Sequence, residues 1–112
     1  MVLEGNPVDM QTELKAVQKM GDILPVDIPI EMISHTDIDG KITPLRLRYE
    51  KEGGEKVTIC FCKEDTIARG EYNFVGVKEL QFICSTVADG TRTTMELRYR
   101  VANEKWRIHR FL

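Results

Sequence analysis

A repeat at an offset of fifty residues constrains the fold of this chain more than any other feature of its sequence. The segment from Ile33 to Tyr49 matches the segment from Ile83 to Tyr99 at eight positions, and each contains an Asp-Gly pair followed by Leu-Arg-Tyr. Hairpins use the same few turn residues, so two unrelated hairpins are the alternative explanation. We expect a duplicated unit.

Hydrophobicity that alternates with period two runs through both halves and predicts six strands. We expect them at residues 30–38, 42–50, 55–62, 79–88, 92–101 and 105–111. The pairs Asp39-Gly40, Gly53-Gly54 and Asp89-Gly90 lie between them, and such residues tolerate the positive φ of tight hairpins. Each half is therefore predicted to be a three-stranded antiparallel meander.

The fold class predicted from this pattern is mainly β: a six-stranded antiparallel barrel or sandwich made of two pseudo-repeated meanders. Unit one covers about 30–62, a connector 63–78, and unit two about 79–111. A barrel is favoured over a sandwich because closure removes exposed sheet edges. At 112 residues, the chain has room for one core, so residues 1–112 are expected to form a single domain.

An amphipathic helix is predicted over about residues 7–20. Asn6 and Pro7 are typical of an N-cap and a first helical position, and Gly21 of a C-terminal stop. A short helix of this kind is marginal alone, so we expect it to pack on the sheet. Its apolar stripe consists of Met10, Leu14, Val17 and Met20.

The order DGKITPLRLRYE, a Gly-Gly-Glu hairpin, an Arg-Gly connector, QFIC, a second Asp-Gly turn and EKW resembles a set of small uncharacterised proteins of Firmicutes. The resemblance covers residues 38–111. It implies a β-rich fold and a bacterial cytoplasmic origin, and it implies no activity. The matching positions are Asp39, Gly40, Pro44, Leu45, Phe82, Cys84, Lys105 and Trp106.

Composition places the chain among ordinary globular proteins, with 42% hydrophobic and 30% charged residues. The first thirty residues show no secretion-signal pattern and no stretch is apolar enough to span a bilayer, so we expect a cytoplasmic protein without membrane contact. The formal charge of −2 is unevenly placed, at −5 before Asp89 and +3 from there onward. That asymmetry is compatible with an anionic partner or with a solvated face.

Metal and enzyme chemistry find little support. A zinc site could be imagined from three cysteines and a histidine: Cys60, Cys62 and Cys84 with His35 or His109. The paired spacing of ligands in structural zinc sites is missing. We therefore expect buried, reduced thiols, no metal and no cofactor. His109 with Cys84 or Ser85 is a conceivable base and nucleophile without a flanking motif. No catalytic residue is assigned, and an enzyme is the third hypothesis.

Outward-facing arginines are the candidate binding residues. They alternate with apolar neighbours, so they are predicted to face outward. If the last strand pairs with the fifth, those of the C-terminal half gather on one exterior patch, with Trp106, Phe111 or Tyr72 as stacking partners for nucleic acid. The alternative is that they pair with Glu50, Glu96 and Glu104 on a soluble surface. The residues of this hypothesis are Arg46, Arg48, Arg98, Arg100, Arg107, His109 and Arg110.

The first functional hypothesis is a non-enzymatic β-barrel that acts as a binding or accessory module. Its partner would be another protein or a second copy of itself. Nucleic-acid binding through the arginines of the C-terminal half is the alternative, and the acidic total charge weighs against it.

Overall fold

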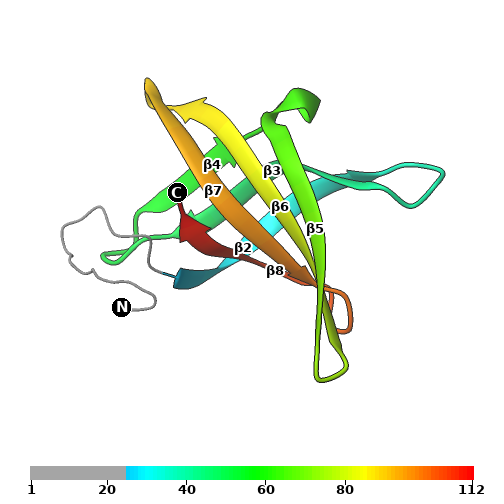
Figure 1. The fold of residues 1–112 in the computed structure, drawn as a ribbon. Coiled ribbons are helices and arrows are strands. Elements are labelled where there is room, and N and C mark those ends of the chain that lie inside the picture. Colours follow the sequence, from blue (N-terminus) through cyan, green and yellow to red (C-terminus); the bar gives the residue numbers. More distant parts are fainter. Residues whose placement is uncertain (1–24) are drawn as a thin grey trace.

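The computed structural model describes residues 25–112, which form one antiparallel sheet of seven strands (Figure 1). Its order is β4-β3-β2-β8-β7-β6-β5, and the helix predicted over 7–20 lies outside the described residues. A 3-10 helix, η1 (Lys63–Asp65), precedes β5. The strands are β2 (Pro25–Thr36), β3 (Ile42–Glu50), β4 (Lys56–Cys60), β5 (Thr66–Phe74), β6 (Val77–Ala88), β7 (Thr91–Arg100) and β8 (Lys105–Phe111).

The sheet consists of two meanders joined at its centre. β2-β3-β4 and β6-β7-β8 are each linked by hairpins, and the pairing of β2 with β8 connects them. That central ladder pairs Ile28 with Ile108 and Ile30 with Trp106. The predicted pair of three-stranded meanders is therefore present, joined into one continuous sheet.

The hydrophobic core lies on the inner side of the curled sheet. Alternation places Leu47 of β3, Leu97 of β7 and Ile108 of β8 on this side, and all three are fully buried. Partly buried Tyr49 and Tyr99 pack against them. The buried cluster comprises Leu47, Ile59, Phe61, Phe82, Cys84, Met95, Leu97 and Ile108.

The two meanders pair in corresponding registers. Leu47 lies opposite Met32 and Ile59, while Leu97 lies opposite Phe82 and Ile108, which are the positions expected from offsets of fifty and forty-nine. The hairpin turns differ in length, and a bulge at Leu45 of β3, which has no partner on β2, restores the register. Duplication itself stays a prediction.

The prediction of six strands is wrong by one, because β5 (Thr66–Phe74) occupies most of the predicted connector 63–78. This edge strand is mostly exposed and carries Arg69 and Glu71 on the side that faces inward, so it lacks the alternation of a half-buried strand. The first strand also begins at Pro25 rather than at residue 30. The bounds of β3 and β8 agree with the prediction.

The predicted barrel or two-layer sandwich is replaced by an open curled sheet whose edges are β4 and β5. β5 pairs along β6 and thus takes the edge that β4 would need for closure. Side chains bridge the gap instead. Arg69 donates from Nη1 to the Ile42 carbonyl at 2.5 Å, and the Thr86 hydroxyl donates to the Cys60 carbonyl at 3.4 Å.

No helix within residues 25–112 has the length and apolar character that crossing a membrane requires.

Candidate functional site

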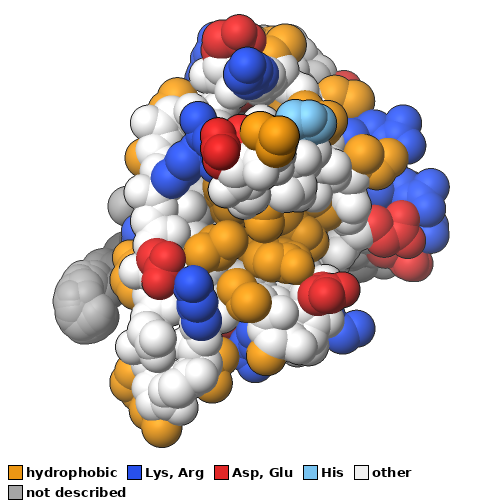
Figure 2. All heavy atoms as spheres, turned by 90° about the vertical axis from the view of Figure 1, so that its right-hand side faces the viewer, with side chains coloured by type: hydrophobic (Ala, Val, Ile, Leu, Met, Phe, Trp, Pro, Cys, Tyr) orange, Lys and Arg blue, Asp and Glu red, His pale blue; other side chains and the backbone are white. Residues whose placement is uncertain are grey.

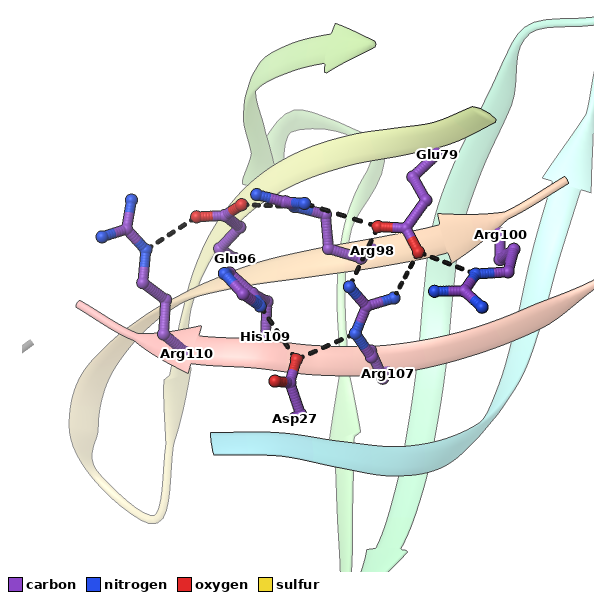
Figure 3. Close-up of polar contacts among 8 residues, drawn as sticks. All are labelled: Asp27, Glu79, Glu96, Arg98, Arg100, Arg107, His109 and Arg110. Carbon is purple, nitrogen blue, oxygen red and sulfur yellow. Dashed lines mark hydrogen bonds and ion pairs between the residues drawn. The ribbon is translucent and has the colours of Figure 1, made fainter. Parts of the chain in front are cut away.

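A cluster of ionised side chains covers the outer side of β6, β7 and β8 (Figure 3). On β7, Glu96, Arg98 and Arg100 alternate with the buried Met95 and Leu97, so they project away from the core. The cluster, here called the arginine–carboxylate cluster, consists of Asp27, Glu79, Glu96, Arg98, Arg100, Arg107, His109 and Arg110.

Glu79 on β6 is the main acceptor in this cluster. Arg107 makes two hydrogen bonds to its carboxylate, both of 2.9 Å, and Arg100 donates from Nε at 3.0 Å. Arg98 adds a longer contact of 3.4 Å. The Glu79 side chain is only 9% exposed, and the hydrogen bonds from Arg107 lower its pKa from 4.5 to about 2. Glu79 therefore stays ionised through most of the acidic range.

Glu96 on β7 is the second acceptor, and its side chain is fully buried. It accepts from Arg98 Nε at 2.5 Å and from Arg110 Nε at 2.7 Å. Burial raises the pKa of a carboxyl group, but the hydrogen bonds from Arg110 and Arg98 outweigh it, so the pKa of Glu96 is lowered. A buried carboxylate without these arginines would be strongly destabilising.

Asp27 brings β2 into the cluster. It has a φ of +47° at a point where the β2–β8 register shifts, and its Oδ1 lies 2.9 Å from both His109 Nδ1 and Arg107 Nε. The hydrogen bond with His109 is the main reason that the pKa of Asp27 is lowered. Arg107 of β8 therefore bridges Asp27 and Glu79, and links β2 on one side to β6 beyond β7 on the other.

The structure brings five of the seven predicted binding residues together: Arg98, Arg100, Arg107, His109 and Arg110 (Figure 3). The other two are on β3, which lies on the far side of β2 from β8. Arg46 is exposed there, and Arg48 pairs with Glu31 at 2.7 Å.

The predicted stacking partners separate onto the two sides of the sheet. Tyr72 lies beneath Arg98, whose guanidinium carbon is 4.3 Å from the ring centroid. Trp106 packs instead against Phe82 and Tyr99 on the inner side, with centroids 5.2 and 4.9 Å away, and Phe111 also packs on the core. Tyr72 is thus the one predicted stacking residue that contacts the cluster.

Sequence reasoning missed Glu79 and Asp27 as acceptors. Glu79 stands in a run of alternating residues at the start of β6, and only the register with Arg100 shows its role. Asp27 lies before residue 30, where the first strand was predicted to begin. Nothing in the sequence therefore indicated that it contacts β8. Of the predicted carboxylate partners, Glu96 binds two arginines, whereas Glu50 lies 3.9 Å from Lys56.

The cysteines do not share the predicted environment. Cys84 is fully buried, and burial raises its pKa. Cys60 and Cys62 are exposed, so the expectation of buried thiols is wrong for these two. Cys62 also lies beyond β4, at the start of η1, because the strand ends two residues earlier than predicted. In residues 25–112, no three His, Cys, Asp or Glu side chains are close enough to hold a metal ion.

The conceivable base and nucleophile are each bonded to other groups. His109 contacts Asp27, the Cys84 thiol lies 3.6 Å from the Thr66 hydroxyl, and the Ser85 hydroxyl lies 2.8 Å from that of Thr94. No hydrogen bond joins His109 to Cys84 or Ser85 in the described part of the chain.

Apolar side chains are exposed at the tip of the β5–β6 hairpin, at the bottom of Figures 1 and 2. Phe74 is 79% and Val75 85% exposed, and the nearby Tyr72 and Val77 are partly exposed. Val75 has a φ of +51°, in the left-handed region that is costly for a β-branched residue. This strained and apolar turn is the second candidate site.

A groove lies between β2 and the turn that joins β7 to β8. Its volume is about 480 Å³, and Ile30, Met32, Ile42, Tyr99 and Trp106 supply its apolar wall. Figure 2 views the molecule from this side and shows apolar side chains gathered in the centre, with charged ones around them. Part of the inner side of the sheet is therefore open to solvent.

Comparison with family models, curated proteins and solved structures finds no match to this chain.

Proposed function

We propose that this protein is a non-enzymatic binding module that associates with a second copy of itself through the β5–β6 hairpin. The observation that carries the proposal is the exposure of Phe74 and Val75 at the hairpin tip. Large apolar side chains that cluster on a surface mark interaction sites more often than single exposed ones do. The left-handed backbone of Val75 adds support, because such strain persists at functional turns.

The edge of β5 favours a second copy as the partner. Among residues 25–112, β5 pairs only with β6, so its other edge offers backbone groups for a further strand, and it contains no proline or lysine, two residue types that protect edges. A two-fold axis at Tyr72 would align Gly70 with Phe74 and Glu71 with Asn73. No like charges would then face each other across the new strand pair.

Sedimentation velocity over a concentration series tests this proposal. We expect a dimer for the native chain, and at least a tenfold weaker dimer for Phe74→Ser, because the variant removes the largest exposed ring. Ile33→Ser is the matched control, since Ile33 is a half-exposed side chain on β2. A native chain that stays monomeric at millimolar concentration refutes self-association, and equal weakening by both variants refutes the role of the hairpin.

Nucleic-acid binding is the second candidate, and one observation favours it. Within the described residues, Arg100 and Arg110 each contact a carboxylate only through Nε. Their side chains are 45% and 36% exposed. Their terminal N–H groups can therefore meet phosphate oxygens. Against it, Asp27, Glu79 and Glu96 neutralise most of the positive charge in the cluster.

Fluorescence anisotropy with short single- and double-stranded DNA and RNA at two salt concentrations tests this candidate. Binding that weakens with salt and is lost in the Arg100→Ala/Arg110→Ala double variant would support it. Arg92→Ala, an exposed arginine at the other end of β7, is the control. Absence of binding at low salt would eliminate it.

A further inference from the structure

A second groove opens at the end of the sheet where β2 begins, and it is independent of the β5–β6 hairpin. It has a volume of about 650 Å³ and lies between the edge strand β4, the turn that joins β6 to β7, and the end of β8. This end of β6 is opposite to the hairpin end. The apolar side chains that line the groove are Tyr49, Val57, Ile59, Val87 and Phe111.

The chain enters the sheet beside this groove. Pro25, the first residue of β2, lies opposite Arg110, and the next residue of β8, Phe111, lines the groove. The four residues 21–24 span about 14 Å at most when fully extended. A segment that ends at Met20 is therefore tethered close to the groove.

The segment 7–20 has the chemistry to fill it. At 100° per residue, Met10, Leu14 and Val17 lie within one narrow stripe of a helix, and Asp9 and Glu13 flank that stripe. Lys15 and Lys19 fall on the opposite side. The groove is lined by Lys51 and Lys56 but also by Glu55 and Asp89, so its charges balance and its apolar side chains are what the stripe would contact.

We propose that residues 7–20 dock on this groove as an amphipathic helix, with Met10, Leu14 and Val17 against its apolar wall. A helix of this length extends about 21 Å. The contact also supplies the tertiary packing that a short helix needs in water. The chain thus covers its own exposed core at this end.

Hydrogen exchange of the full-length chain, followed by mass spectrometry of the peptide that contains residues 8–20, tests the docking. We expect at least tenfold protection of its amides in the native protein. Leu14→Ser should abolish this protection, and Lys15→Ser, on the opposite side of the helix, should leave it unchanged. An unprotected native segment, or equal effects of the two variants, would overturn the proposal.

A second pair of variants tests the groove itself. Val87→Asp places a charge in the groove at a side chain that is 57% exposed, and Val101→Asp does the same near the hairpin end at a side chain that is 40% exposed. Urea midpoints would verify that both variants fold. Protection of residues 8–20 should fall at least tenfold in Val87→Asp alone. If it survives in Val87→Asp, or falls equally in both, the assignment of this groove is wrong.

Discussion

Replacement of Glu79 by glutamine should destabilise the protein by about 3 kcal/mol at pH 7. Hydrogen bonds from Arg107 and Arg100 lower the pKa of this carboxyl group from 4.5 to about 2, and each unit corresponds to about 1.4 kcal/mol of preference for the ionised form. The side chain is only 9% exposed, so screening by solvent is limited. Glu79→Gln keeps the shape of the side chain and removes the charge that Arg107, Arg100 and Arg98 contact.

The same pKa shift predicts how this contribution depends on pH. Because the folded-state pKa is lowered, the stabilisation is complete above the unfolded value of 4.5 and is lost as the pH falls through about 2. The difference in free energy of unfolding between the native chain and Glu79→Gln should therefore be constant from pH 7 to pH 5. With these two pKa values, it should be about 1.4 kcal/mol at pH 3.

Urea denaturation at pH 7, 5 and 3 measures these differences. Glu71→Gln is the matched control, since Glu71 lies on the neighbouring strand, is half exposed and has Lys78 at 3.6 Å. Such exposed pairs contribute at most about 0.5 to 1 kcal/mol. If Glu79→Gln lies within 1 kcal/mol of the native chain at pH 7, or if the difference does not shrink at pH 3, the arginines do not stabilise Glu79 as described.

Two further predictions concern the inner side of the sheet. Leu97→Ala should lower the free energy of unfolding by about 2 to 5 kcal/mol, because the side chain is fully buried between the two neighbouring strands; a loss below 1 kcal/mol in urea denaturation would contradict that packing. Cys84 should react with a thiol reagent at least a hundredfold more slowly than Cys62 in the folded protein, because it is buried and burial raises its pKa. Mass spectrometry would measure these reaction rates, and equal rates for all three thiols would argue against the place of Cys84 in the core.

Local pattern was sufficient for the strands whose two sides differ. β3 and β8 alternate apolar and polar residues, and their bounds agree with the prediction. The turn of Asp89 and Gly90 has the positive φ values that such pairs favour. These features depend on residues that are adjacent along the chain, so they can be predicted from the sequence alone.

Contacts between distant residues could not be predicted in the same way. β5 was missed because it is an exposed edge with charged side chains on the side that faces inward, and its turn begins with Val75, a residue that rarely adopts positive φ. The outward direction of Arg98 and Arg100 followed from alternation. Their shared acceptor, Glu79, depends on the register between β6 and β7, which alternation does not determine.

The central position of β8 has a consequence for folding kinetics. β8 lies in the middle of the sheet, yet its partner β2 precedes it by about eighty residues, as the contact between Asp27 and Arg107 shows. Closing a loop of this length costs about 1.8 kcal/mol more entropy than closing one of ten residues. Each meander can form from local hairpins in microseconds, whereas the search that joins β2 to β8 is expected to be the slow step, on the millisecond-to-second scale of β proteins with distant contacts.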